Sequence, residues 1–503
     1  MVSRGLKDIH VFEARGQKFA FNGGTYAIGL LDDVGFNILS RALDGETLSN
    51  EEAGLSEMIC HGITTNTPTL DCDVSINRAQ KRTPVSAGLS SLCLNITSHC
   101  NMKCSYCFNH QGRYGFGSRQ PMSEQTAKAA IDFLLSRCAG NQCKVTFFGG
   151  EPLTQFDLIK KVVAYAKQQG HRKGLTISLH VTTNGSLLTR EIARFLKQHD
   201  FSIIVSLDGD EITHNYHRQF PNGQGTYQAV LKGIRHLLDE YGSQSKITLR
   251  GTYTRQQRFF SSSFMHLVNL GFEHMSIEPA TGGKLDEHAI RPVDVPALRE
   301  EYEDLAGHYS QVHSRNPQVR YFHISRLIDN LTQNRMTNRP CGAANSYMAV
   351  SPDGSLFPCH RIMSEKYCMG NVHDMIRGRD LDQTIQQTFH SETTAIRQSC
   401  RDCWVRNLCG GTCYAHGIDI DYGISKPNPV DCELLKLRAE LAVALLVEER
   451  LADKRAKVRG GLNHVLVFPG VPTGLINSQS RYDGCDGECE GCESCCDYDA
   501  LAD

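Results

Sequence analysis

The sequence lacks any uninterrupted apolar run long enough to span a membrane, although 40% of its 503 residues are hydrophobic. The longest apolar candidate, ELAVALLVEERLA from Glu440, is interrupted by charged residues and is typical of an amphipathic helix. The first residues, MVSRGLKDIHVFEARG, lack the apolar segment of a secretory signal. We therefore expect a globular, cytoplasmic protein with no membrane partner.

The sequence also lacks an excess of charge of either sign. Its 53 Lys and Arg residues nearly balance its 55 Asp and Glu residues, which leaves a formal net charge of −2. General nucleic-acid or membrane-surface binders are typically strongly basic, so we expect neither kind of partner. The chain is too long for one ordinary core, and roughly two to four domains are expected.

Cysteine, in contrast, is abundant, with 21 residues. A reducing cytosol does not sustain a disulfide framework, so these cysteines point to metal binding or catalysis. The tightest group lies in SHCNMKCSYCFNHQ, where Cys100, Cys104 and Cys107 have C-x3-C-x2-C spacing. No fourth Cys nearby completes a tetrahedral zinc site. Three thiolates on one short loop suit a [4Fe–4S] cubane that keeps one iron open.

Alternating strand and helix patterns begin at Leu92 and continue to about residue 320. The strand candidates are LCLNIT, KVTFFGG, LTISLHVTT, SIIVSLDG, ITLRGTYT and HMSIEP. This alternation predicts an α/β fold with a parallel sheet, open or curled into a partial barrel. Chemistry in such folds lies at the carboxyl ends of the strands, and the Cys100 loop directly follows the first one.

These features resemble the radical S-adenosylmethionine (SAM) enzymes, whose signature is C-x3-C-x2-C with an aromatic residue before the third Cys, here Tyr106. Three further matches, FFGGEP, VTTNG and VSLDG, follow strands in the order that the family requires. The resemblance implies a partial (β/α)6 barrel with a SAM-bound [4Fe–4S] cluster on Cys100, Cys104 and Cys107. It also implies a 5′-deoxyadenosyl radical that abstracts hydrogen from a substrate.

By the same resemblance, SAM would be bound by Gly149, Gly150, Glu151, Pro152, Asn184, Ser206 and Arg218. Glu151 would accept from the SAM ammonium, Ser206 would contact the ribose, and Arg218 would face the carboxylate. Ser206 and Arg218 could instead be ordinary polar residues at a barrel rim. The GGEP stretch alone could be an ordinary strand-to-helix turn.

A second cysteine group resembles the SPASM domain, which carries two auxiliary [4Fe–4S] clusters. Seven cysteines and Gly354 follow the order of that domain, and the resemblance implies that they hold the clusters as follows. The outer cluster would use Cys400, Cys403, Cys409 and Cys432. The inner cluster would use Cys341, Cys359 and Cys413, and would either keep an open iron or recruit Cys368. A zinc ribbon, the alternative, would need two CxxC pairs, and only Cys400 and Cys403 form one here.

His360 directly follows Cys359, at the place where the anaerobic sulfatase maturases, which resemble the chain in both cluster regions, have an Asp base. His360 is therefore the candidate catalytic residue, although a hydrogen-bonded neighbour of the cluster is the simpler interpretation. The combination of regions resembles the thioether-forming peptide maturases, which include the quinohemoprotein amine dehydrogenase maturation proteins. In those enzymes a Cys sulfur becomes attached to a substrate carbon.

We therefore predict five regions. They are a winged-helix-like peptide-recognition module (1–75), a linker (76–90), a radical SAM core (91–320), a SPASM domain (321–455) and a flexible, acidic, Cys-rich tail (456–503). The recognition module would pair a strand with a leader peptide. The expected partners are a Cys-containing peptide or protein substrate and an electron donor such as flavodoxin or ferredoxin.

The expected reaction is formation of a Cys thioether cross-link in that substrate. The alternatives are oxidation of Cys or Ser to formylglycine, as in the sulfatase maturases, and a non-catalytic iron–sulfur electron carrier. An electron carrier would not need the residues at the strand ends, so these residues favour an enzyme.

The tail allows two interpretations. Its last 22 residues, YDGCDGECEGCESCCDYDALAD, contain no Lys or Arg and place Cys485, Cys489, Cys492, Cys495 and Cys496 among Asp and Glu. One interpretation is a segment that scavenges metal. The other is a substrate-like segment, because thioether maturases act on Cys with acidic residues nearby.

Overall fold

The computed structural model describes residues 6–65, 88–110, 120–242, 244–452, 459–462 and 465–468. Most of the predicted linker and the Cys-rich end of the predicted tail lie outside the described residues. In the part of the chain that the structure describes, no helix combines the length and the apolar character needed to cross a membrane.

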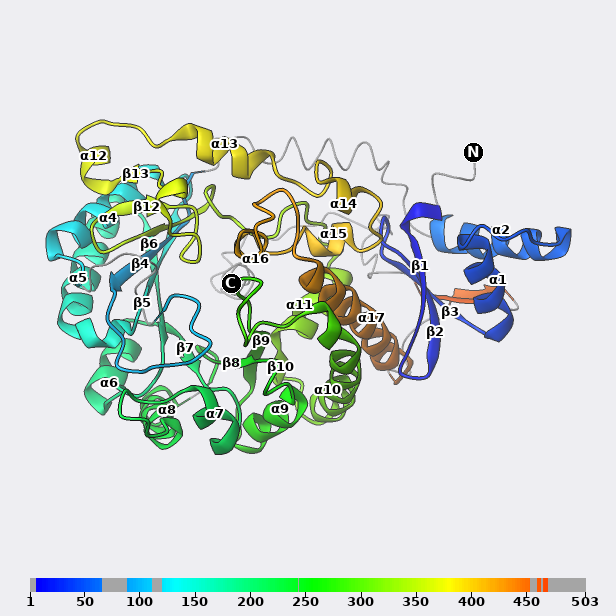
Figure 1. Cartoon of the computed structure of the whole chain (residues 1–503), viewed down its shortest axis with the longest axis horizontal. Helices are drawn as coiled ribbons and strands as arrows, with labels where there is room; N and C mark the ends of the chain where they lie inside the picture. Colours follow the sequence, from blue (N-terminus) through cyan, green and yellow to red (C-terminus); the bar gives the residue numbers. More distant parts are fainter. Residues whose placement is uncertain are drawn as a thin grey trace, which may run out of the picture.

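The N-terminal module is an antiparallel sheet covered by two helices (Figure 1). Its strands are β1 (Ile9–Ala14), β2 (Gln17–Asn22) and β3 (Ala27–Leu31), and its helices are α1 (Asp33–Leu43) and α2 (Asn50–Thr65). Helix α1 begins at the N-cap Asp32, whose carboxylate accepts a hydrogen bond from the Gly35 amide. The strand–strand–strand–helix order follows the pattern expected from the sequence.

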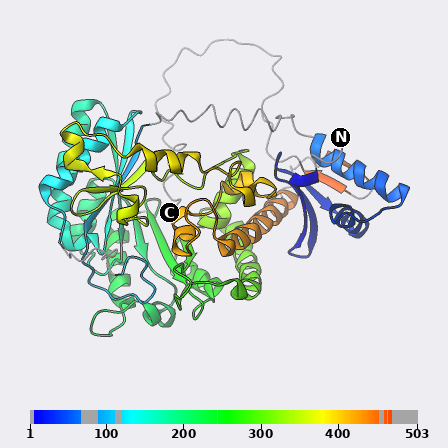
Figure 2. The ribbon, with the colours of Figure 1, turned by 45° about the horizontal axis from the view of Figure 1, so that its top comes forward.

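Two strands from the other end of the chain extend this N-terminal sheet. β15 (Val465–Phe468) pairs antiparallel with β3, and β14 (Arg459–Leu462) pairs with β15. The orange strand lies beside the blue sheet in both Figure 1 and Figure 2. These residues fall within the range predicted as the tail (456–503), so the first part of that range belongs to the N-terminal sheet.

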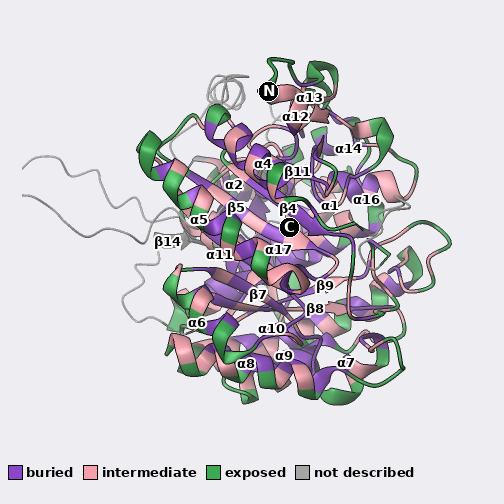
Figure 3. Cartoon of the chain, turned by 90° about the vertical axis from the view of Figure 1, so that its left-hand side faces the viewer, coloured by how far each residue is buried: buried purple, intermediate pink, exposed green. Residues whose placement is uncertain are grey.

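The central sheet contains six parallel strands in sequence order, each paired with the next. They are β4 (Ser91–Thr97), β5 (Gln142–Gly149), β6 (Thr176–Thr183), β7 (Ser202–Ser206), β8 (Ile247–Tyr253) and β9 (His274–Pro279). A short strand, β10 (Arg320–Tyr321), pairs parallel with β9. The strands are largely buried, whereas the surrounding helices expose their outer faces (Figure 3). The predicted α/β fold with a partial (β/α)6 barrel is confirmed.

The helices of this barrel cover the outside of the sheet (Figure 1). They are α4 (Glu124–Arg137), α5 (Phe156–Lys173), α6 (Arg190–Gln198), α7 (Glu211–His217), α8 (Tyr227–Tyr241), α9 (Phe260–Asn269) and α10 (Val295–Arg315). The hydroxyl of Ser123 accepts from the Thr126 amide at 3.0 Å and caps α4, as the sequence predicts. The α4 residues predicted to share a face, Ala127, Ala130, Ile131, Leu134 and Leu135, are all buried.

The Cys-rich region continues the same sheet instead of forming a separate layer. Its first strand pairs parallel with β4, and the next two follow in antiparallel order. Its strands are β11 (Tyr347–Val350), β12 (Ser355–Phe357) and β13 (Gly370–Asn371). Its helices are α12 (Val372–Ile376), α13 (Gln383–Ser391), α14 (Gln398–Arg401), α15 (Arg406–Cys409) and α16 (Tyr414–Asp419). The region is therefore fixed beside the first strand of the barrel.

Helix α17 (Pro429–Ala452) joins the three parts of the molecule, because it packs against α10, α11 (Phe322–Thr332) and β1. The expected amphipathic pattern is wrong for its middle, where residues 437–447 are all buried. Two charged side chains there have partners, which lowers the cost of their burial. Glu440 Oε1 lies 2.9 Å from His10 Nε2, and Arg438 donates to the hydroxyl of Tyr302 at 2.7 Å.

We expect Phe21→Ala to weaken the docking of the N-terminal module on α15 and α17. Phe21 is fully buried in the hydrophobic cluster that joins them, and its ring meets Trp404 edge-on at 5.8 Å. Truncation of a buried Phe costs about 3–5 kcal/mol. Amide hydrogen exchange of residues 9–31 measures this cost as a lower free energy of opening.

The matched control is Val34→Ala, which changes a side chain that is 49% exposed on α1. Its effect should stay within about 0.5 kcal/mol. Equal exchange rates in the Phe21 and Val34 variants would contradict the packing described.

Candidate active site

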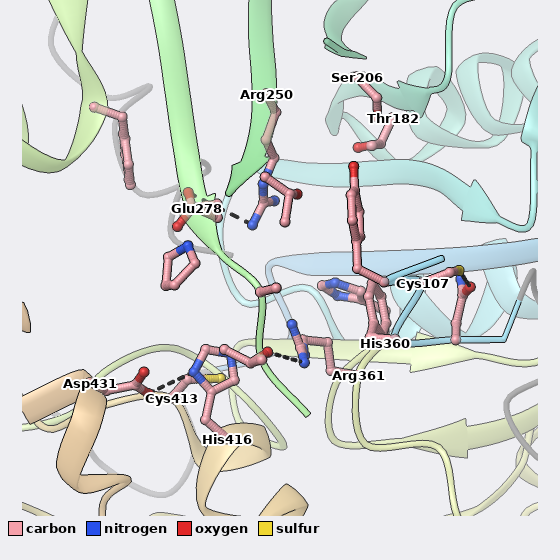
Figure 4. Close-up of a pocket in the computed structure, with 18 of the residues that line it drawn as sticks. Cys107, Thr182, Ser206, Arg250, Glu278, His360, Arg361, Cys413, His416 and Asp431 are labelled. Atoms are coloured by element: carbon pink, nitrogen blue, oxygen red, sulfur yellow. Dashed lines mark hydrogen bonds and ion pairs between the residues drawn. The ribbon is translucent and has the colours of Figure 1, made fainter. Parts of the chain in front are cut away.

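A cavity of about 380 Å³ opens at the carboxyl ends of the parallel strands. Side chains from β5 to β9, from the Cys100 loop and from the Cys-rich region line it (Figure 4). One wall therefore belongs to the barrel and the facing wall to α11, α17 and the second cysteine group. This is the position in which the sequence analysis expects the chemistry.

The three thiols of the loop, Cys100, Cys104 and Cys107, all line this cavity. Burial raises the pKa of Cys100 to about 11 and that of Cys104 to about 12, and the neighbouring Cys107 thiol adds to both shifts. Three thiols this close together become ligands only beside a cationic centre that stabilises their thiolates. The donor set therefore fits an iron–sulfur cluster.

Two glycines allow the ends of β4 and β5 to approach each other here. Gly149 has φ +133°, and a Cβ on it would lie 2.4 Å from the carbonyl oxygen of Thr97. A Cβ on Gly150 would lie 2.3 Å from the carbonyl oxygen of His99, which precedes the first thiol. Any side chain at position 150 would therefore displace the Cys100 loop.

Glu151 is fully buried and connects three strand ends. Its Oε1 accepts from the Thr183 hydroxyl at 2.7 Å and from the Leu153 amide at 3.0 Å, and its Oε2 accepts from the Asn184 amide at 2.6 Å. Burial raises the pKa of Glu151 to about 7, although these hydrogen bonds oppose the shift. A carboxylate oxygen has two lone pairs, so Oε2 keeps an acceptor position for a further donor.

The other predicted SAM contacts divide into two groups. Asn184, Ser206 and Arg218 line the cavity together with both glycines and Glu151. Pro152 does not line it, because it is buried as the first residue of the 3-10 turn Pro152–Gln155. The side-chain amide of Asn184 donates to Asn101 Oδ1 at 2.8 Å and thereby supports the Cys100 loop.

Arg218 is held by a buried ion pair. Its Nε donates to Asp208 Oδ2 at 3.0 Å, and the hydroxyl of Tyr106 donates to the same oxygen at 2.6 Å. The guanidinium lies 5.3 Å from the centre of the Tyr106 ring, and its charge counteracts the burial that raises the pKa of Cys104. The aromatic residue of the cysteine motif is thus fixed to the end of β7 through Asp208.

Several charged residues of the cavity were not predicted. Arg250, in the middle of β8, and Glu278, near the end of β9, lie 3.9 Å apart (Figure 4), and His323 Nε2 lies 2.6 Å from Glu278 Oε2. A charged residue within a largely apolar strand, as in ITLRGTY and HMSIEP, was a usable signal. Arg326 and Arg361 come from a helix and a loop, where no local pattern indicates the cavity.

His360 lies in the cavity wall, as its position after Cys359 suggests. Its Nδ1 lies 2.7 Å from the Tyr347 hydroxyl, and its ring centre lies 4.8 Å from that of Phe148. Burial, helped by the charges of Arg361 and Arg250, lowers the pKa of His360 to about 3. The burial of the ring and its contact with the Tyr347 hydroxyl favour the simpler role of a hydrogen-bonded neighbour.

The second cysteine group also comes together. Burial raises the pKa of Cys409 and Cys432, and in both residues the nearby thiols of Cys400 and Cys403 raise it further. These four residues are the predicted outer set, and α15 and the start of α17 supply two of them. The structure therefore places all four thiols within electrostatic range of one another.

Two of the three predicted inner residues, Cys341 and Cys413, line the cavity, and Figure 4 shows Cys413 on the other side of it from Cys107. Cys359 is buried next to His360. The thiol of Cys368 lies 3.6 Å from the carbonyl oxygen of Gly370, and Cys368 does not line the cavity. Among the described residues, no group of three or more His, Cys, Asp or Glu side chains converges closely enough for a single metal ion.

Family profiles match the chain in both cysteine regions. The profile of the radical SAM superfamily matches residues 94–257, and that of the SPASM iron–sulfur cluster-binding domain matches residues 341–404. These segments contain the Cys100 loop with the ends of β5 to β8, and much of the second cysteine group. The order and location of both motifs agree with the predicted resemblance.

Known proteins give a consistent result. The chain is 25% identical over 358 residues to the "Serine-type anaerobic sulfatase-maturating enzyme" of Klebsiella aerogenes, which covers 67% of this chain and 82% of that protein. It is 30% identical over 205 residues to an uncharacterized protein of Methanocaldococcus jannaschii, covering 41% of this chain and 68% of the relative. The solved structure "Native anSMEcpe with bound AdoMet" covers 72% of this chain and 99% of its own, with a TM-score of 0.60 and 20% identity, and shows a shared fold.

We expect Gly150→Ala to disturb the Cys100 loop, because its Cβ would overlap the carbonyl group of His99 and approach the Cys100 amide to 2.9 Å. The backbone on both sides cannot move without breaking the bond from the Glu151 amide to the His99 oxygen. Iron incorporation should fall by about four atoms per chain, which corresponds to one cubane. The control Gly54→Ala, where a Cβ meets nothing within 4 Å, should retain full iron.

We expect the folded protein to lose stability in acid because of His214, which lies in α7 close to Asp208. The His214 imidazole is fully buried, and its Nε2 lies 2.9 Å from the Thr226 hydroxyl oxygen. Burial lowers the pKa of His214 from 6.5 to about 4. As the pH falls, His214 is therefore protonated in the unfolded chain before it is protonated in the folded chain. The stabilisation that the folded state gains from the neutral ring is complete above pH 6.5 and is lost as the pH falls through 4.

His214→Gln should reduce the decline in unfolding free energy between pH 6.5 and 4 by up to about 3 kcal/mol, measured by urea unfolding of the barrel. His61→Gln, at an exposed position of α2, should leave the decline unchanged. The same decline in the His214 variant and the parent chain would exclude this origin.

Proposed function

The chain belongs to the radical SAM superfamily and contains a SPASM domain, and from this premise we propose that it is a maturase that forms Cys thioether cross-links in a peptide or protein substrate. One observation carries the proposal. A single cavity is lined both by the Cys100 loop and by Cys341 and Cys413. A substrate between them would touch both cysteine groups at once.

We assign the residues of the first wall to the SAM-bound cluster. Cys100, Cys104 and Cys107 would hold three irons and leave the fourth for SAM. When bound, the cluster and SAM supply a 5′-deoxyadenosyl radical that removes a hydrogen atom from a substrate carbon. Glu151 Oε2 would accept from the SAM ammonium, while the ion-paired Arg218 and the hydroxyl of Ser206 would orient the rest of the molecule.

The facing wall would hold the two auxiliary clusters. Cys400, Cys403, Cys409 and Cys432 would supply four thiolates to the outer one. The inner one would use Cys341, Cys359 and Cys413, and an iron without a protein ligand would accept a substrate thiolate, which is a soft ligand.

The proposed reaction balances without a further oxidant. One C–H bond and one S–H bond of the substrate break, and one C–S bond forms. SAM would become methionine and 5′-deoxyadenosine, which carries away the hydrogen atom from carbon; the thiol proton would be released, and the electron used for SAM cleavage would be recovered when the C–S bond forms. The substrate loses two hydrogens and keeps its sulfur.

The side chains of the cavity would prepare the substrate for this step. Phe108, Phe148 and Phe322 line the cavity and would give the substrate an apolar surface. Arg326 and Arg361 lie on the same lining and would attract acidic residues that flank a substrate Cys. The electron for SAM cleavage would come from a flavodoxin- or ferredoxin-like donor.

A second candidate is formylglycine formation in a sulfatase. The 25% identity to a sulfatase-maturating enzyme, over 82% of that protein, favours it. His360 opposes it, because the maturases have an Asp base at that position. The two products differ in one readout, since formylglycine made from Cys loses its sulfur and a thioether retains it.

The first test is the iron and sulfide content of anaerobically purified protein, which should be about twelve irons per chain for three cubanes. Cys104→Ala should lose about four irons and all release of 5′-deoxyadenosine on reduction with SAM. Cys60→Ser, on α2, is the matched control and should retain both. Protein that holds clusters yet never releases 5′-deoxyadenosine would overturn the proposed function.

A further inference from the structure

The edge of β3 that does not pair with β2 pairs with a distant segment of the same chain. Four consecutive residues of β15 pair with it, from Val465 opposite Leu31 to Phe468 opposite Ile28. A sheet edge with unpaired N–H and C=O groups is a general binding site for an extended peptide. The site at which a recognition module would take a peptide from solution is filled here by residues 465–468.

The sequence beyond β15 differs from that of a folded domain. Pro469 follows directly, and a proline cannot continue the ladder of a strand with neighbours on both sides. Residues 482–503 contain five Cys and eight Asp or Glu, with no Lys or Arg. This composition does not supply a core of its own.

The tethered segment is long enough to reach the cavity. Cys485 is 17 residues beyond Phe468, which allows a span of up to roughly 56–61 Å at about 3.3–3.6 Å per residue. A compact chain of 503 residues has a radius of gyration of roughly 23 Å. The tail Cys residues can therefore reach the cavity from the N-terminal sheet.

The charge of the cavity suits an acidic occupant. Of the arginines that line it, Arg218 and Arg361 are ion-paired with Asp208 and Asp419, and Arg250 lies 3.9 Å from Glu278. Arg326, on α11, forms no ion pair with any residue that the structure describes, and its guanidinium lies 5.9 Å from the ring centre of Phe322. An acidic peptide would supply the missing counter-charge.

We propose that the chain carries its own substrate: β15 pairs with the N-terminal sheet, and a Cys between Cys485 and Cys496, in the sequence that follows, enters the cavity and becomes a thioether. This inference rests on the proposed function and uses the same balanced reaction. The S–H bond of the tail Cys and a C–H bond of a neighbouring tail residue break, a C–S bond forms, and SAM is the oxidant.

The test uses the full-length chain, reconstituted anaerobically and incubated with SAM and a reductant. Proteolysis and mass spectrometry should show a loss of two hydrogens within residues 469–503, with all sulfur retained. The fraction modified per minute should not change on tenfold dilution, because the substrate is tethered. A rate that falls in proportion to dilution would overturn modification within one chain.

Two failures can be told apart. Release of 5′-deoxyadenosine with an unchanged tail mass would overturn the self-substrate inference and leave the proposed function standing, with a separate peptide as the substrate. If 5′-deoxyadenosine is not released at all, the proposed function falls and this inference falls with it. Iron bound by a tail of unchanged mass would also overturn the inference and would identify a metal-scavenging segment.

A strand variant tests the role of β15. Val467→Pro removes an amide from a strand that is paired on both sides, with β3 and β14. We expect tail modification to slow by about tenfold or more, because the local concentration of the tail falls. Leu475→Pro, outside β15, is the matched control. Hydrogen exchange of residues 27–31 should increase only in the Val467 variant, and this readout does not depend on the clusters.

The contribution of charge is tested at Arg326. Arg326→Gln should slow tail modification, and Arg326→Lys should restore most of the rate because it keeps the positive charge. If the Gln and Lys variants modify the tail at the same rate as the parent chain, the cavity does not select an acidic segment by charge.

Discussion

The site depends on one buried carboxylate. Glu151 receives hydrogen bonds from its own turn and from the Thr183–Asn184 end of β6, and its amide donates to the carbonyl group before Cys100. The loop with the three thiols is thus held to the ends of β5 and β6 by bonds that water does not reach. Such bonds are strong in a low-dielectric interior, and their geometry fixes where a cluster and its ligand could lie.

The second half of the cavity is built on a different principle. Helix α17 is surrounded by the barrel, the N-terminal module and α15, so it gains stability from packing on all sides. Arg438 and Glu440 cross this core with partners from separate elements. Hydrophobic burial therefore fixes the position of the second cysteine group relative to the barrel. As a result, two walls from distant parts of the sequence form one cavity.

Much of the barrel wall could be predicted from sequence because its chemistry is local. The C-x3-C-x2-C loop, the GGEP turn and the asparagine after β6 each lie within a few residues of a strand end, where short-range spacing is informative. Arg326, His323 and Arg361 could not be found in this way, since only the packing of α11 and of a loop brings them to the cavity.

The burial of α17 was missed because its charged residues indicate an exposed face, and their partners lie more than a hundred residues away. Strand β15 has four residues, too few for a period to emerge, and its partner is at the other end of the chain.

The pairing of β15 with β3 also bears on stoichiometry. A catalyst normally releases its product and meets a new molecule, whereas a segment joined to the polypeptide by peptide bonds cannot be exchanged. Each copy of the protein would then complete its chemistry once per reactive group in its own tail. The amount of modified material would equal the amount of protein synthesised, and the ribosome rather than the turnover number would set the yield.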